Sequence, residues 1–218
     1  MHLKIDLQYF PTIISCIALN KATHVDFLLS ESWERRGFRN RMILVSANGP
    51  VQLTVPILGG RNQKGRYADI RIDHRSNWQK QHWGTIFSAY GNSPWFFQYA
   101  PELEAIYTER DEFLANWNLR CFRWIWAKWF GTFPDPLVTE SGALDVRVDL
   151  SNTLEPANFQ DGSGGLLKAY PQVFQDRFGF QPNLSVLDLL FCLGPQGASY
   201  LAESSGVLVL GDAQMPEN

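Results

Sequence analysis

Four arginines lie within seven residues and form the densest group of anion-binding side chains in the sequence. They are Arg35, Arg36, Arg39 and Arg41, and Asn40 adds an amide donor and acceptor. A guanidinium presents paired N–H donors that match phosphate and carboxylate oxygens. In an extended run Arg39 and Arg41 share one face, with Asn40 on the other. We interpret Arg36, Arg39, Asn40 and Arg41 as candidate ligand-binding residues. The alternative is an edge strand whose arginines prevent pairing with other chains.

His82 is the histidine whose surroundings best suit acid–base chemistry. A predicted helix places it on one face with Trp78, Ile86 and Ala89. Imidazole titrates near neutral pH, so it can accept a proton from a substrate amine. We therefore interpret His82 as a candidate general base. The alternative is a core histidine that is hydrogen-bonded to a backbone carbonyl.

Aromatic side chains surround His82 and also precede the arginines. The chain has eight Trp and fifteen Phe, which are many for its length. Indole rings can stack on sugars or bases, and lysine can pair with an anion. We predict ligand contacts from Trp33, Trp78, Lys80 and Trp83, and we expect most other aromatic side chains to form the core.

The sequence carries no motif for a metal or a cofactor. Its four histidines are scattered without an HExxH pattern, and its three cysteines form no CxxC pair. Residues 60–65 have the glycine spacing of a phosphate loop, but Arg66-Tyr67 follows where Lys-Ser/Thr is required. Residues 161–165 are glycine-rich without a preceding apolar strand, and there is no Gly-x-Ser-x-Gly elbow. We predict no metal and no cofactor.

The 218-residue chain has a formal net charge of −3, and this charge is unevenly divided. Residues 1–100 carry +6 and residues 101–218 carry −9. A basic first half suggests an anionic small molecule as ligand, unless the two halves neutralise each other in the fold. Domains that bind nucleic acid are usually basic overall, so the net charge disfavours that class.

The sequence favours a cytoplasmic protein that does not insert into a membrane. An odd number of widely spaced cysteines suits a reducing compartment. No apolar run reaches eighteen residues, the length of a membrane span. Residues 13–16 resemble a lipoprotein box, but Asp6, Gln8 and Pro11 interrupt the segment that would be the signal core. A strand followed by a buried helix is the preferred interpretation of this segment.

The first part of the chain predicts mainly strands. Residues 3–7 and 25–29 are short apolar strands around a buried helix, which gives a β-α-β opening. Residues 42–47 and 51–58 flank Asn48-Gly49, the signature of a hairpin with a type I′ turn. Residues 68–72 are predicted as a further strand.

Helices dominate the second part. Ser76 and Gln79 predict a capping box for a helix that ends near residue 90. Ser93-Pro94 predicts the start of a further short helical piece. Pro101 suits the first turn of one long helix, whose apolar spacing continues to residue 125. A strand is predicted within residues 144–150. Ser185 caps the last helix with Asp188 as third-position acceptor, and Gly194 ends it.

These patterns predict an α/β fold, or a mixed α+β one, with a β-α-β start, a β-hairpin and a mostly helical second half. We expect a single domain over residues 1–218. Its strand-rich part is residues 1–75 and its helical part residues 76–133. A connection and the C-terminal helix occupy residues 134–210, with a mobile glycine-rich segment at 162–165. Residues 211–218 are predicted to be a frayed tail.

Ordered motifs across nearly the whole chain resemble the WbqC-like protein family, in the branch common in Bacteroidetes. In the first half they are Tyr9-Phe10-Pro11, the Arg36-to-Arg41 block, Ala47-Asn48-Gly49, Leu53-Thr54-Val55-Pro56, Trp78-Gln79-Lys80-Gln81-His82-Trp83, Ser88-Ala89-Tyr90, Ser93-Pro94 and Phe96-Phe97. In the second half they are Tyr170-Pro171-Gln172-Val173-Phe174, Phe180-Gln181-Pro182-Asn183-Leu184-Ser185, Asp188-Leu189-Leu190-Phe191 and Gly194-Pro195.

The resemblance implies a step in the synthesis of surface polysaccharide, because the family is named for a member found in O-antigen gene clusters. It supplies no reaction. The shared motifs include Tyr9, the arginine block and His82, which makes these residues stronger site candidates. Many members carry an Asp-Asp pair before the arginines, whereas this chain has Ser30-Glu31-Ser32. Any base or metal-binding role of that pair would fall to Glu31 alone.

From these features we derive one working hypothesis. The protein acts on a nucleotide-linked sugar and transfers an acyl or aminoacyl group to an amino sugar. Arg36, Arg39 and Arg41 would hold the diphosphate, His82 would deprotonate the acceptor amine, and Glu31 would hold a sugar hydroxyl. Tyr9, Trp33, Trp78, Lys80 and Trp83 complete the predicted site.

Two other classes of function are open at this point. A non-catalytic binding or scaffold protein of polysaccharide assembly would bind a ligand or a partner without turnover. A nucleic-acid binder could use the arginines and the aromatic side chains, although the acidic second half argues against it.

Overall fold

A β-α-β unit opens the chain, as predicted. The computed structural model describes residues 2–60, 63–131, 148–150 and 167–204. Strand β1 (His2–Ile5) leads into α1 (Ile13–Lys21) and then β2 (His24–Phe27), which pairs with β1 in parallel. Strand β5 (Val148–Asp149) pairs in parallel with the other side of β1, so the sheet order is β2-β1-β5. This confirms the strand predicted within residues 144–150.

Strands β3 (Arg41–Ser46) and β4 (Gly49–Thr54) form the predicted antiparallel hairpin, but its predicted turn type is wrong. A type I′ turn needs a positive φ at both loop residues. The loop consists of Ala47-Asn48, and neither residue has a positive φ. Gly49, with a φ of 103°, is instead the first residue of β4. The freedom of glycine is therefore used at the start of the strand.

The strand predicted at residues 68–72 is also wrong. This segment contains a 3₁₀ turn, η2 (Tyr67–Asp69), followed by isolated bridges from Arg71 to Phe113 and from Ile72 to Ile57. The backbone N–H of Asp69 donates to the Arg66 carbonyl, which closes the turn locally. Only the end of the segment is left extended and able to pair.

Two helices, α3 (Phe96–Thr108) and α4 (Leu114–Ala127), replace the single long helix predicted after Pro101. Pro101 lies inside α3, and residues 93–95 form a turn. The break has a tertiary cause. The N–H of Ile72 donates to the Glu112 carbonyl and the N–H of Leu114 donates to the Ile70 carbonyl. These bonds hold residues 112–114 against another segment and override the helical spacing.

Helix α2 (Trp78–Tyr90) forms without the predicted capping box. Its N-cap is Asn77, whose side chain makes no capping hydrogen bond. Gln79 instead donates from Nε2 to the carbonyls of Tyr107, at 2.9 Å, and Glu109. The side chain predicted to cap its own helix therefore ties α2 to the C-terminal end of α3.

The C-terminal region contains α5 (Gln175–Phe178), α6 (Val186–Leu193), a short 3₁₀ turn η3 (Gly194–Gln196) and α7 (Gly197–Glu203). Two predicted boundaries of α6 are confirmed. The Ser185 side chain accepts from the Leu187 N–H, and Gly194 ends the helix with a φ of 54°.

The predicted capping role of Asp188 is wrong, because its side chain is fully buried among hydrogen-bond donors from other elements. The Asp188 carboxylate accepts from Tyr90 Oη at 2.8 Å, Tyr170 Oη at 2.5 Å and Gln172 Nε2 at 2.9 Å. Burial raises the pKa of Asp188, and the three hydrogen bonds oppose that rise.

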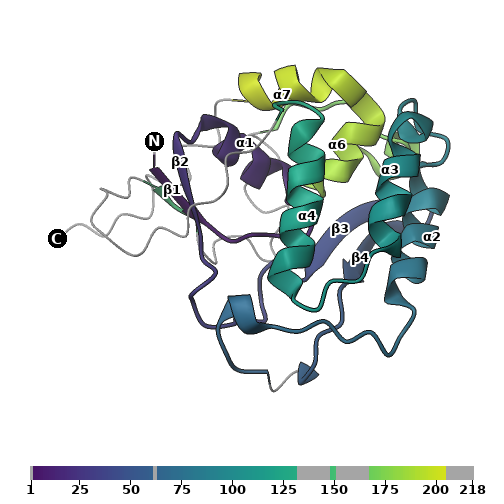
Figure 1. The fold of residues 1–218 in the computed structure, drawn as a ribbon. Helices are drawn as coiled ribbons and strands as arrows, with labels where there is room; N and C mark the ends of the chain where they lie inside the picture. The colour runs from purple at the N-terminus through teal and green to yellow at the C-terminus, as the bar shows by residue number, and fades with distance from the viewer. Residues whose placement is uncertain (1, 61–62, 132–147, 151–166, 205–218) are drawn as a thin grey trace.

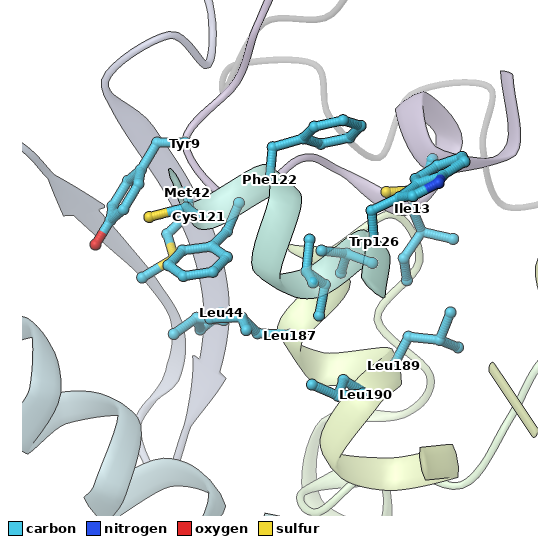
Figure 2. Packing of buried hydrophobic residues seen from close by; sticks show 14 of the residues in the cluster. Tyr9, Ile13, Met42, Leu44, Cys121, Phe122, Trp126, Leu187, Leu189 and Leu190 are labelled. Carbon is cyan, nitrogen blue, oxygen red and sulfur yellow. The ribbon is translucent and has the colours of Figure 1, made fainter. Parts of the chain in front are cut away.

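In Figure 1 the hairpin lies between α4 on one side and α2 and α3 on the other, with α6 above it. One face of β4 stays exposed, at Pro50, Gln52 and Thr54. Helices α2 and α6 both contact β3, α1 contacts α6 and α7, and α4 contacts η2. One large apolar cluster extends from residue 3 to residue 201. In Figure 2, Met42 and Leu44 of β3 lie close to Cys121 of α4, with Leu187 of α6 beside them. The three cysteines are free and buried, as expected for a chain without a disulfide framework.

Within the described ranges, no helix is both long enough and apolar enough to cross a membrane. The predictions for residues 162–165 and 211–218 lie outside the described residues.

Candidate functional site

Arg39 is directed into the protein. Its side chain is 1% exposed. Its Nε and Nη2 lie 2.9 Å and 2.7 Å from Asp6 Oδ1, and Nη1 donates to the Ser32 carbonyl at 2.9 Å. The guanidinium also lies over the Tyr67 ring, 5.1 Å from its centroid. Because these partners occupy the guanidinium nitrogens, Arg39 is not available to a diphosphate.

The neighbours of Arg39 divide into one internal residue and three surface cations. Asn40 is buried and donates from Nδ2 to the Val55 carbonyl at 2.9 Å, so it joins the arginine segment to the end of β4.

Arg35 and Arg36 are exposed, and Arg41 is half-buried. Arg41 Nη1 donates to the Arg36 carbonyl at 3.3 Å. Burial, and secondly the charge of Arg35, lower the pKa of Arg41. The surface cations can therefore meet an anion, whereas Asn40 has a structural partner.

His82 is held inside the protein by two hydrogen bonds. Its side chain is 5% exposed, and Nδ1 lies 3.0 Å from Tyr9 Oη. A hydrogen bond to the backbone of Thr54 raises the pKa of His82, as a carbonyl acceptor does, but burial is the larger effect and lowers the pKa to about 4. The imidazole is therefore neutral near pH 7.

The His82 contacts continue through two tyrosines. Tyr9 Oη lies 2.5 Å from Tyr107 Oη, which belongs to α3. The Thr54 carbonyl can only accept, so the ring nitrogen facing it carries the hydrogen and Nδ1 accepts from Tyr9. Tyr9 then has no hydrogen left for Tyr107, so Tyr107 donates to Tyr9. This order joins the end of β4, α2, the loop before α1 and α3.

The loop that carries Tyr9 has a strained backbone. Phe10 has a φ of 43°, and such values are uncommon for residues other than glycine. The surrounding structure holds it there. The Tyr9 N–H donates to the Phe38 carbonyl, and Ser185 Oγ donates to the Phe10 carbonyl at 3.0 Å.

A surface pocket of about 280 Å³ lies between the start of α2 and the end of α3. Basic, acidic, amide and aromatic side chains share its wall. Of the predicted site residues, only Lys80 and Trp83 line it. The full lining is His74, Ser76, Asn77, Gln79, Lys80, Trp83, Glu104, Tyr107, Thr108 and Arg110.

The other eight lining residues were not predicted as site candidates, and four of them, His74, Glu104, Tyr107 and Arg110, have charged, imidazole or phenol side chains. Nothing in the local pattern singles them out, because α3 was predicted to continue through residue 110. The break between α3 and α4 is what brings Arg110 to the same pocket as Lys80. A better prediction of that helix end is the only sequence signal that could have found them.

The other predicted site residues lie away from the pocket wall. Glu31 pairs with Lys4 of β1 at 2.8 Å. Trp33 is buried against Tyr67, with ring centroids 6.0 Å apart. Trp78 is buried with its ring centroid 5.1 Å from that of His82. The structure therefore brings together Trp78, His82 and Tyr9 in the core, and Lys80 and Trp83 at the surface.

Among the described residues no group of three or more His, Cys, Asp or Glu side chains is placed to hold a metal ion.

The sequence model of the WbqC-like protein family matches residues 8–145, which is more than half of the chain. The chain belongs to the WbqC-like protein family. No curated protein and no solved structure matches it. The part of the WbqC-like chain that matches contains the arginine block, His82 and every residue of the pocket. The motifs at residues 170–195 lie beyond the matched part.

Proposed function

We propose that this WbqC-like protein binds a nucleotide-linked sugar in the pocket between α2 and α3. In this proposal it transfers an acyl or aminoacyl group to an amino sugar during the synthesis of surface polysaccharide. The observation that carries the proposal is the composition of the pocket wall, where Lys80, Arg110 and Trp83 converge. A substrate with phosphates joined to a sugar and a base needs both cations and an aromatic surface.

Each feature of the wall suits one part of such a substrate. Lys80 and Arg110 pair with phosphate oxygens. Trp83 offers a ring on which a sugar or base can stack, and Glu104 accepts from sugar hydroxyls or an ammonium group. The start of α2 adds a further attraction for anions, because Asn77 makes no capping bond and leaves first-turn N–H groups without a side-chain partner.

The exposed arginines provide a second place for the diphosphate. Arg41 is half-buried beside Arg35. Within the part of the chain that the structure describes, neither of them nor Arg36 forms a salt bridge with an acidic side chain. Cations brought together without a counter-charge favour a bound anion. This location is the one expected from the sequence, without Arg39.

A thermal-shift and calorimetry panel tests the proposal. UDP-, dTDP- and GDP-sugars, acetyl-coenzyme A and a single-stranded RNA are added to the wild type. Two double variants, Lys80→Ala/Arg110→Ala and Arg36→Ala/Arg41→Ala, are compared. A ligand at 100 times its Kd adds about 2.7 kcal/mol of stability, or roughly 5–10 °C in Tm for a chain of this size. We expect a nucleotide sugar to bind and the Lys80/Arg110 variant to abolish the shift.

Each other outcome changes the conclusion in a defined way. Loss of binding only in the Arg36/Arg41 variant would place the ligand at the exposed arginines Arg35, Arg36 and Arg41 and not in the α2–α3 pocket. Binding of RNA at low ionic strength would replace the proposal with a nucleic-acid function. No shift with any nucleotide sugar rejects the proposed substrate class.

A scaffold function is the second candidate, and one observation favours it. Phe97 and Phe87 are 71% and 50% exposed on α3 and α2. Large exposed aromatic side chains on neighbouring helices are typical of contact surfaces for other proteins. This candidate predicts a partner whose binding is lost in Phe87→Ser/Phe97→Ser and retained in the Lys80/Arg110 variant.

A further inference from the structure

We propose that His74, which lies at the wall of the α2–α3 pocket, is the general base of the acyl transfer, in place of His82. This assignment rests on the proposed function of the pocket. It adds a residue that the sequence did not single out and gives the acceptor amine a defined proton partner.

The hydrogen bond of His74 defines which ring nitrogen is free. His74 Nε2 lies 2.8 Å from the carbonyl oxygen of Asp111. A carbonyl oxygen only accepts, so Nε2 carries the hydrogen. In the neutral imidazole Nδ1 then holds the lone pair. Nδ1 has no hydrogen-bond partner in the part of the chain that the structure describes. The backbone therefore fixes the neutral tautomer in which Nδ1 can accept a proton.

His74 is accessible, whereas His82 is not. His74 is half-buried and lines the pocket, with its ring centroid 6.3 Å from that of Trp78. His82 does not line the pocket, and both of its ring nitrogens are engaged inside the protein. The remaining histidines, His2 and His24, belong to β1 and β2. His74 is the one histidine among the described residues that a ligand in this pocket can reach.

The charges around His74 come from three directions. In its own segment Asp73 pairs with Arg75, and in the facing loop the Asp111 carboxylate pairs with Arg120. The pocket wall adds Lys80 from α2, Glu104 from α3 and Arg110 from the loop after α3. Asp73 and Asp111, the acids nearest to His74, are thus already paired with arginines. Lys80, Arg110 and Glu104 of the pocket wall remain to act on a ligand. Lys80 and Arg110 can hold its phosphates while Glu104 and His74 face its polar groups.

The proposed step is the attack of a neutral sugar amine on the carbonyl carbon of an acyl thioester. The N–C bond forms as the C–S bond breaks, and the amine nitrogen gives up one proton to His74 Nδ1. The leaving thiolate then takes that proton, which returns His74 to its neutral form. The thioester is the co-reactant that this step requires, and no oxidation or reduction takes place.

The variant His74→Gln is the first test, with His24→Gln as a matched control on the surface of β2. Glutamine keeps an N–H donor for the Asp111 carbonyl and removes the base. The probes are UDP-glucosamine and acetyl-coenzyme A, with release of the coenzyme A thiol as the readout. We expect a loss of about 10²- to 10⁴-fold in kcat for His74→Gln, the usual range for a lost general base. UDP-glucosamine binding by calorimetry should change less than threefold, and His24→Gln should match the wild type. Turnover by His74→Gln within threefold of the wild type overturns the assignment.

NMR of ¹⁵N-histidine protein tests the assignment without turnover. His74→Gln identifies the signals of that ring. We expect the neutral imidazole to carry its hydrogen on Nε2, and saturating UDP-glucosamine to change the ¹⁵N signals of His74 because the ligand lies against its ring. A hydrogen on Nδ1, or signals that stay unchanged although calorimetry shows the probe to be bound, overturns the role of His74. Absence of UDP-glucosamine binding in calorimetry is a different result, because it rejects this amino sugar as the substrate, whereas the tautomer of His74 is measured without any ligand and still tests the assignment.

Discussion

Tyr9 Oη donates a hydrogen bond to His82 Nδ1 over 3.0 Å, across 73 positions of sequence. Both side chains are buried, and Tyr107 and the Thr54 backbone extend the contact at its two ends. Four segments of the chain are thereby joined by polar groups inside an apolar core. Buried polar groups that are fully paired favour one arrangement of the core, because any other arrangement leaves them unpaired. The principal role that this geometry gives His82 is therefore structural.

Stability should fall as the pH is lowered from about 6.5 to about 4, in part because of His82. Its pKa is near 6.5 in the unfolded chain and about 4 in the folded protein, so the unfolded state binds the proton first. The stabilisation is complete above pH 6.5 and is lost as the pH falls through the folded value. The loss is about 1.4 kcal/mol per pH unit and about 3 kcal/mol in total. Urea unfolding from pH 4 to 8 measures it. His82→Gln should reduce the pH dependence of the unfolding free energy between pH 4 and 6.5. If the variant and the wild type showed the same pH dependence, burial of a neutral His82 would not be its cause.

Removal of Arg39 should cost far more stability than removal of Arg36. Asp6→Ala leaves the buried Arg39 guanidinium without its carboxylate and should cost about 3–5 kcal/mol of unfolding free energy. Arg39→Ala should be similarly costly. Arg36→Ala removes an exposed side chain and should change stability by less than about 0.5 kcal/mol. Denaturant unfolding of the three variants makes the comparison. Equal stability of Arg39→Ala and Arg36→Ala would contradict the internal role of Arg39.

Asp188 should tolerate an isosteric change better than a truncation. Asp188→Ala leaves Tyr90, Tyr170 and Gln172 without their shared acceptor inside the core. Each unpaired group costs about 1–3 kcal/mol, and the costs do not simply add. Asp188→Asn keeps an acceptor oxygen and the volume, so we expect it to lose less than half as much. Thermal and urea unfolding of both variants tests the difference. Equal losses would show that volume, and not hydrogen bonding, matters at this position.

Two glycines should show opposite effects when replaced by alanine. Gly84 lies exposed within α2 with no atom near an added Cβ, so Gly84→Ala should stabilise by about 0.5–1 kcal/mol. Gly194 has a φ of 54°, and an added Cβ would overlap the Trp95 ring. Gly194→Ala should destabilise by about 2 kcal/mol or more. Changes in Tm of opposite sign are the expected result. A neutral Gly194→Ala would mean that the Trp95 ring can move aside at little cost.

Local patterns predicted most elements of the fold. Two short apolar strands around a buried helix predicted the β-α-β unit, and Ser185 and Gly194 predicted both ends of α6. These signals act over a few residues, through backbone geometry and nearby hydrogen bonds. The errors arose where distant segments compete for the same backbone groups. Ile72 pairs with Glu112 and ends a run that the apolar spacing alone continues as one helix.

The candidate site was less predictable than the fold, because exposure is not a local property. Four adjacent arginines have the same chemistry in the sequence, yet only Arg39 meets Asp6, 33 positions away, and is withdrawn from solvent. His82 and His74 differ in the same way, since distant partners decide which ring nitrogen is free.

The sequence by itself determined the family, the class of fold, the order of its main elements and the segments in which charged and aromatic side chains are dense. Only the tertiary structure decided which of those side chains are structural and which can meet a ligand. The physical reason is the cost of burying a polar group, which is met only by a partner placed with good geometry. For Arg39, His82 and Asp188 those partners come from elsewhere in the chain. Lys80, Arg110 and His74 reach a common pocket because α3 ends where it does.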